Sequence, residues 1–222
     1  MVLLVAIFAG AGGAHGPGPV AIAHAQHAAD RGSASKIPDS VWSRMQGRSW
    51  HRGRGCPSPE RLSLLTIPYR DFGGQRQTGR MIVARAVADQ VLDVFAAIHR
   101  AGFPIASMRL VSDFGGSDAR SMAANNTSAF NCRLKSSGRG LSDHARGLAI
   151  DINPVQNPYV ARGRVQPVSA RKYARPGNRR GASVGVITRN GPVVRAFRRI
   201  GWGWGGNWRR VRDYQHFSRS GR

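Results

Sequence analysis

The chain has 222 residues, of which 41% are hydrophobic, enough for a folded core, which excludes a wholly disordered protein. No run of 18 apolar residues occurs, which excludes a membrane-spanning helix from the mature protein. Lys and Arg total 34 against 11 Asp and Glu, so the net charge is +23. Such a surface should attract polyanions, namely nucleic acid, anionic lipid or anionic cell-wall polymer. Only three of the 34 basic residues are lysines, a bias that genome composition explains as readily as function does.

Residues 1–25 form an uncharged leader rich in Gly and Ala, which ends in Ala23-His24-Ala25. An apolar segment followed by an A-x-A site is typical of a secretory signal peptide. The leader lacks the basic residues that usually precede the apolar part, so a disordered leader is the alternative. We predict a signal peptide at 1–25 and a secreted or wall-associated protein. No lipobox cysteine is present, so we predict no lipid anchor.

Residues 26–55 are polar and show little periodicity, which indicates a linker or loosely packed arm. Trp42 and Trp50 within this segment indicate that part of it docks on the domain. We predict a single catalytic domain at 56–218, followed by a short tail at 219–222.

Cys56 and Cys132 are the two cysteines of the chain. Two cysteines cannot complete a structural zinc site by themselves. In an exported protein they favour one disulfide, with a pair of buried free thiols as the alternative.

The clearest periodic segment is 85–100, where apolar residues recur at helical spacing up to a stop at Gly102. Helices and strands mix without βαβ alternation, which favours an α+β fold with a small antiparallel sheet flanked by helices. The predicted elements are helices at 85–100 and 193–200, strands at 108–112, 129–133, 147–153 and 213–218, a loop at 113–128 and an irregular segment at 154–183.

Two separated segments combine histidine with carboxylate. In the first, His144 opens a loop and Asp151 lies on an otherwise apolar strand, where an ionised carboxylate is costly unless it is paired or bound to a metal. The second contains Asp213 and His216. Two imidazoles and a carboxylate that leave a fourth position open to water make a catalytic zinc site, and a second carboxylate beside it can act as general base. Alternatively, each His is an ordinary satisfied polar residue and each Asp pairs with an arginine.

Strand geometry constrains the second segment. Residues three apart on a regular strand face opposite sides, so Asp213 and His216 share a site only if one of them lies in the turn before the strand. The glycine-rich approach at 201–206 makes such an irregular entry feasible.

The ordered motifs resemble the VanY-type D-alanyl-D-alanine carboxypeptidase family, whose members are zinc peptidases of bacterial cell-wall metabolism with the fold of the Hedgehog signalling domain. The resemblance covers roughly 55–218. Its motifs in this sequence are Ser142-x-His144-x-x-Gly147-x-Ala149-x-Asp151, Asp213-x-x-His216, the stretch from Asn125 to Arg133, Asp151-Ile152-Asn153-Pro154 with Asn157-Pro158-Tyr159, and the tryptophan-rich turn from Trp202 to Trp208.

The resemblance implies that His144, Asp151 and His216 bind Zn²⁺. It implies that Asp213 is the general base, where some relatives have the longer Glu. The family also uses an arginine to stabilise the developing oxyanion. Arg133 is the first candidate, because alternation along 129–133 places it with Asn131 on the face opposite Phe130 and Cys132. Arg120 is the second candidate.

Side chains near these motifs are candidate substrate-binding residues. Trp204 and Trp208 are expected either to floor a cleft beside the metal or, for at least one tryptophan of the turn, to lie in the core. The remaining candidates are Ser142 and Arg120. Between Asp151 and Asp213 the chain has fourteen Lys and Arg and no carboxylate, which fits either a solvated face or attraction to wall phosphates.

The leading hypothesis is a secreted, monomeric zinc peptidase that acts on peptidoglycan stem peptides, without a nucleic-acid partner. The alternative is a basic non-catalytic protein that binds cell wall or nucleic acid. The sequence contains no recognised DNA- or RNA-binding motif. It does contain all four residues of the candidate metal site and base, which favours the enzyme.

Overall fold

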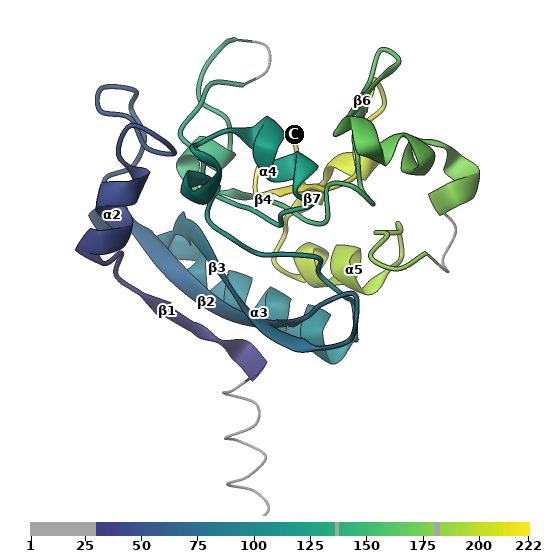
Figure 1. The fold of residues 1–222 in the computed structure, drawn as a ribbon, viewed down its shortest axis with the longest axis horizontal. Helices are drawn as coiled ribbons and strands as arrows, with labels where there is room; N and C mark the ends of the chain where they lie inside the picture. The colour runs from purple at the N-terminus through teal and green to yellow at the C-terminus, as the bar shows by residue number, and fades with distance from the viewer. Residues whose placement is uncertain (1–29, 136–137, 180–182) are drawn as a thin grey trace, which may run out of the picture.

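The longest strands of the molecule are two nine-residue strands that the sequence analysis did not predict. A computed structural model describes residues 30–135, 138–179 and 183–222, so the predicted signal peptide lies outside the described residues. Strands β2 (Leu62–Arg70) and β3 (Arg76–Ala84) form an antiparallel hairpin, and the short β1 (Ser33–Ser35) pairs with the outer edge of β2 (Figure 1). Asp71 closes the hairpin turn by accepting hydrogen bonds from the amides of Gly73 and Gln75, both at 2.9 Å.

Helix α3 (Ala88–Arg100) covers one face of this hairpin. Its buried stripe includes Val91, Leu92, Phe95 and Ile98, which confirms the predicted helix and its apolar face. The first turn of the predicted helix, Arg85–Val87, is a 3-10 turn and not α-helical. The predicted helix at 193–200 is confirmed as α5 (Pro192–Arg199), which packs against α3.

The second half of the molecule contains only short strands, joined by long irregular connections. The α+β class with antiparallel sheets flanked by helices is therefore confirmed, and the described residues form three three-stranded sheets rather than one. The first of the two small sheets has the order β4 (Ala149–Asp151), β9 (His216–Ser218), β7 (Gly203–Trp204), and the second has the order β6 (Arg164–Gln166), β5 (Tyr159–Ala161), β8 (Val211–Asp213).

The strands predicted at 108–112 and 129–133 are wrong. Only isolated bridges join Met108 to Thr127 and Ser128 to Asp151. At 108–112 no strand forms because a side chain, and not a neighbouring strand, bonds the backbone. The buried Asn126 amide accepts from the backbone N–H of Arg109 at 2.8 Å and donates to its carbonyl at 3.0 Å.

Other predicted elements need smaller corrections. The predicted loop at 113–128 contains the 3-10 helix η3 (Val111–Phe114) and helix α4 (Asp118–Ala123). The irregular segment at 154–183 contains β5 and β6 and the 3-10 turns η5 (Val168–Ala174) and η6 (Pro176–Arg179). The strand at 147–153 shortens to β4, and the strand at 213–218 divides into the end of β8 and all of β9.

The described part of the predicted arm is packed rather than loose. It contributes β1 and helix α2 (Asp39–Met45), whose Val41 and Met45 are buried. These two residues belong to a second apolar cluster, separate from the core between α3 and the hairpin, which also contains Leu62, Leu64, Ile82, Leu110, Phe130 and Cys132. Trp42 and Trp50 pack against this cluster with their ring centres 4.7 Å apart, as the docking interpretation requires.

A disulfide between Cys56 and Cys132 ties this N-terminal region to the segment that precedes His144, which confirms the predicted pairing. Among the residues described, no helix is both long and apolar enough to cross a membrane.

Candidate metal centre

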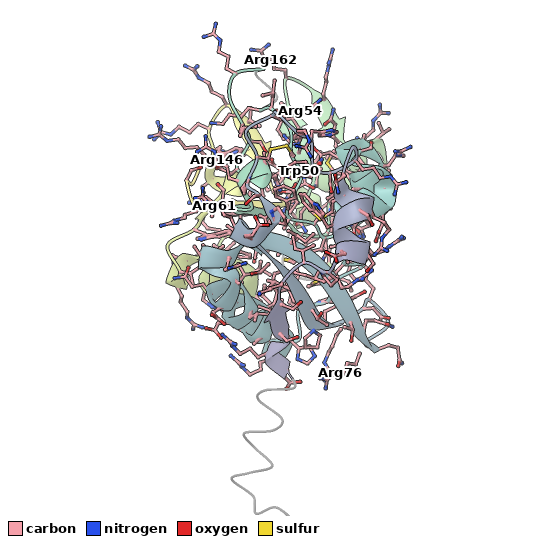
Figure 2. The ribbon with its side chains drawn as sticks, turned by 90° about the vertical axis from the view of Figure 1, so that its left-hand side faces the viewer. Trp50, Arg54, Arg61, Arg76, Arg146 and Arg162 are labelled. Carbon is pink, nitrogen blue, oxygen red and sulfur yellow. A yellow bond between two sulfur atoms is a disulfide. The ribbon has the colours of Figure 1, made fainter. Side chains whose placement is uncertain are left out.

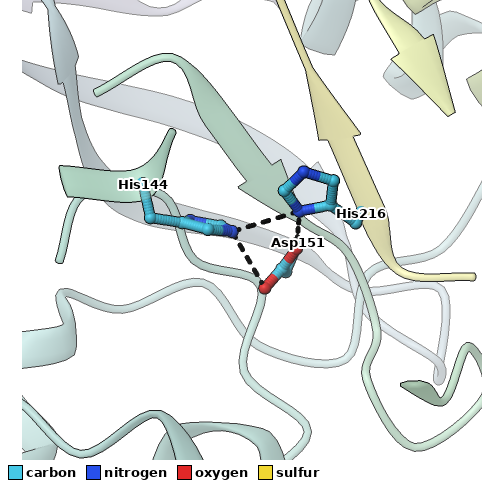
Figure 3. A group of neighbouring side chains, drawn as sticks. All are labelled: His144, Asp151 and His216. Carbon is cyan, nitrogen blue, oxygen red and sulfur yellow. Dashed lines mark hydrogen bonds and ion pairs between the residues drawn. The ribbon is translucent and has the colours of Figure 1, made fainter. Parts of the chain in front are cut away.

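His144, Asp151 and His216 meet at the junction of three chain segments (Figure 3). Asp151 ends β4 and His216 begins β9, and the two residues are direct partners in the antiparallel ladder. His144 lies on the 3-10 turn η4 (His144–Arg146). The predicted trio therefore comes together from positions 65 and 72 residues apart in the chain.

The three candidate donor groups form a small triangle. His144 Nε2 lies 3.2 Å from His216 Nδ1 and 3.2 Å from Asp151 Oδ2, and His216 Nδ1 lies 3.0 Å from Asp151 Oδ1. Ligand atoms bound tetrahedrally to zinc at about 2.0–2.1 Å are separated from each other by roughly 3.3 Å. The cluster therefore has donor types and spacings that fit one tetrahedral zinc ion.

A backbone hydrogen bond orients His144. Its Nδ1 lies 2.6 Å from the carbonyl oxygen of Ala129, and a carbonyl can only accept, so Nδ1 carries the proton. When the ring is neutral, its lone pair lies on Nε2, the atom that faces Asp151 and His216. Metal-binding histidines are commonly fixed in this way by a hydrogen bond from the second ring nitrogen.

The charges of the cluster support one another. Burial alone raises the pKa of Asp151, but the charge and hydrogen bonding of His144 and His216 prevail and hold it well below its ordinary value. Burial lowers the pKa of His144, yet Asp151 outweighs this effect and raises it. Asp151 is therefore an ionised carboxylate, the form that a metal ligand requires.

The loop that carries His144 is held against the apolar hairpin. Gly147 closes η4 with φ +69°, and its carbonyl accepts from the backbone N–H of Ala84 at 2.9 Å. A Cβ on Gly147 would collide with the backbone at Ala84, so glycine is needed here for both reasons. Ser142 is buried, and its Oγ accepts from the amide of Ala145 at 3.3 Å, so its side chain is bonded within this turn.

Asp213 lies across a two-residue turn from His216. β8 ends at Asp213 and β9 begins at His216, which provides the irregular entry that the strand geometry demands. The Oδ1 atom of Asp213 is buried without a hydrogen-bond partner in the described structure. Burial, reinforced by the negative charge of Asp151, raises the pKa of Asp213 to about 6. A carboxyl group with this pKa is suited to exchange protons near neutral pH.

Arg133 is held by a carboxylate that the sequence analysis missed. Its guanidinium pairs with Asp118, in the first turn of α4, and Asp118 also accepts from Nδ2 of the buried Asn131 at 2.7 Å. The backbone N–H of Asn131 in turn donates to the carbonyl of His144 at 3.2 Å. Asn131 and Arg133 therefore share one side of the segment, as alternation predicted.

Phe130 and Cys132 lie on the opposite side, in the second apolar cluster. The charges of Arg133 and Asp118 both act on the pKa of His144, in opposite directions. The pair therefore lies within electrostatic reach of the candidate metal centre. No sequence signal links Asp118 to Arg133, because their contact is tertiary.

The remaining candidate residues fall into two groups. Trp208 is half-buried, and its ring centre lies 5.4 Å from that of His216. Trp204 belongs to the main core, where it faces Phe217 and donates from Nε1 to the carbonyl of Tyr214 at 2.8 Å. Arg120 folds back onto its own turn, with Nε donating to the carbonyl of Phe114 at 2.9 Å.

Residues 135–219 match the family model described as D-alanyl-D-alanine carboxypeptidase. This segment contains His144, Asp151, Asp213 and His216, so the family that the motifs resemble is confirmed for this part of the chain. Arg133 and Asp118 lie before the matched residues. The comparisons with curated proteins and with solved structures found no match.

Proposed function

We propose that this protein is a secreted zinc metallopeptidase that hydrolyses a peptide bond in peptidoglycan stem peptides, in the manner of a D-alanyl-D-alanine carboxypeptidase. The observation that carries the proposal is the triangle of His144, Asp151 and His216 with Asp213 beside it, inside the segment that matches the family. The Cys56–Cys132 disulfide supports an extracytoplasmic location, because disulfides persist in oxidising compartments.

His144 Nε2, His216 Nδ1 and a carboxylate oxygen of Asp151 are the proposed zinc ligands. A zinc ion bound by three protein ligands would act as a Lewis acid toward a peptide carbonyl. It would also lower the pKa of water, so that the nucleophilic hydroxide is available near neutral pH. The hydrogen bond from His144 to Ala129 and the ladder pairing of Asp151 with His216 hold the three donors in place before metal binds.

Asp213 is the proposed general base. Its Oδ1 has no partner among the described residues, so it is free to accept the proton of the attacking water. The same carboxyl group then returns this proton to the amine that leaves when the C–N bond breaks. The products are one new carboxylate and one free amine, so a single water molecule is consumed.

Arg133 is the proposed oxyanion-stabilising residue. A guanidinium is always charged and presents a rigid set of donors, which suits an oxygen that gains negative charge. Asp118, which also accepts a hydrogen bond from Asn131, holds it on the side of the segment that bonds to the loop of His144. Trp208, beside His216, is the proposed wall of the substrate site, while Trp204 serves the core.

Chromatography of stem-peptide digests tests the proposal. The zinc-loaded protein should release products from a bond that involves a D-amino acid. Asp213→Asn should retain zinc and lose turnover by about 10²–10⁴-fold, because an amide cannot accept the proton.

Asp143→Asn is the matched control. Asp143 adjoins His144, but its carboxylate accepts from Ser220 at the surface, so this variant should remain active. A zinc-loaded wild type that cleaves neither stem peptides nor sacculi would refute the enzyme and leave a non-catalytic wall-binding protein. Full activity of Asp213→Asn would refute the assigned base.

A further inference from the structure

The small sheet of β6, β5 and β8, whose strand β8 ends at Asp213, also carries a group of exposed arginines. Four of them, here called the arginine strip, lie in the turn between β5 and β6, on β6 and just before β8: Arg162, Arg164, Arg209 and Arg210. The strip lies within the interval between Asp151 and Asp213 that contains fourteen Lys and Arg and no carboxylate. Figure 2 shows Arg162 at the end of the molecule opposite Arg76.

The strand register relates one member of the strip, Arg164, to the candidate active site. Tyr159 pairs with Asp213, and two residues along β5, Ala161 pairs with both Val211 and Arg164. Directly paired residues, and residues two apart on a strand, point to the same face. Arg164 therefore shares a face with Asp213, about 7 Å along the strands and about 10 Å across two strand spacings.

The strip has no internal countercharge. None of its four arginines forms an ion pair with a carboxylate in the described ranges, whereas Arg31, Arg76, Arg109 and Arg133 all do. Exposed guanidinium groups without a carboxylate partner keep their donors available for phosphate, which they bind in a bidentate manner.

We propose that the arginine strip docks a phosphodiester polymer of the cell wall beside the peptidase site. This inference rests on the proposed function, because the peptidase supplies the cell-wall setting. Stacking platforms for nucleotide bases are aromatic, and neither β6 nor residues 209–212 contain an aromatic side chain. The adjoining Trp208 lies against His216 and donates from Nε1 to the carbonyl of Gly221 at 2.8 Å. The strip therefore fits a partner recognised by its backbone charge rather than by bases.

Co-sedimentation with purified sacculi tests the strip by binding, independently of cleavage. The test variant is R162Q/R164Q/R210Q, and the matched control is R195Q/R198Q/R199Q, which removes three exposed arginines from α5. Both variants lose the same charge. The strip variant should bind about tenfold more weakly than wild type, a loss consistent with three exposed charge contacts, and the control should bind as wild type does.

Sacculi freed of phosphodiester polymer by acid extraction should bind wild type and strip variant alike. Wild-type binding to intact sacculi should weaken as salt rises, because the Debye length shortens. Equal weakening by both variants, or none by the strip variant, would overturn the proposal. Stronger competition by RNA than by wall polymer at equal phosphate would replace it with nucleic-acid binding. Selective wall binding by a protein that cleaves nothing would refute the peptidase and retain the strip.

Discussion

The hairpin of β2 and β3 with α3 and the region around the candidate metal centre are built in different ways. The first has nine-residue strands and an interface made mainly of apolar side chains, among them Leu65, Ile67 and Phe95. The second has three-residue strands, and buried side-chain amides take the place of further backbone ladders, as Asn126 does for residue 109. Apolar packing is non-directional and tolerant, whereas a buried amide fixes particular atoms at particular places.

This difference separates stability from chemistry. The two regions are joined at Gly147, whose carbonyl accepts a hydrogen bond from the backbone N–H of Ala84 at the end of β3. This bond holds the loop that carries His144 against the hairpin. The apolar half therefore serves as a rigid base, and the polar half holds the candidate metal ligands. Substitutions in the two halves should have separable effects.

The largest effect on stability is expected in the apolar half. Phe95 is 1% exposed in the core of α3 against the hairpin. Phe95→Ala should lower the free energy of unfolding by about 3–5 kcal/mol, through lost burial and the cavity left behind. Denaturant unfolding measures this loss. Turnover and zinc content of the folded fraction at low temperature should equal those of wild type, and a specific loss of turnover would break the proposed separation.

A smaller effect, on rate instead of stability, is expected at Asp118. Asp118→Asn removes the charge that holds Arg133 and should lower kcat about tenfold, with KM and zinc content little changed. This loss is smaller than the roughly 10²–10³-fold cost of removing an oxyanion donor, because the guanidinium itself remains. Steady-state kinetics on a stem peptide measure kcat and KM separately. Asp118→Glu should restore part of the lost kcat.

The matched control is Asp113→Asn, which breaks a comparable ion pair with Arg109. It should leave kcat unchanged. If Asp118→Asn lowers the melting temperature while kcat stays at the wild-type value, Asp118 has only a structural role.

The candidate centre was accessible to sequence reasoning because its donors lie on short local motifs. His144 and Asp151 are seven residues apart and Asp213 and His216 three, so only the meeting of the two segments had to come from the fold. Asp118 gave no such signal, since it reaches Arg133 from another element across 15 residues.

The fold was harder to predict where burial or side-chain bonding hides the usual patterns. Leu62–Arg70 is buried on both faces over most of its length, so the alternation that marks a strand is absent. At 108–112 the apolar pattern is that of a strand, but Asn126 occupies its backbone groups. The helix at 85–100 was predictable because one face is buried and the other solvated.

Zinc binding by the chelator-treated protein tests the central claim most directly. Titration with zinc, followed by elemental analysis, should give one tightly bound ion per chain for wild type. His216→Ala should lose this ion, while His51→Ala, which removes a histidine outside the cluster, should keep it, with circular dichroism confirming that both variants are folded. A folded wild type that binds no zinc, or that binds it as tightly after His216→Ala, would contradict the account.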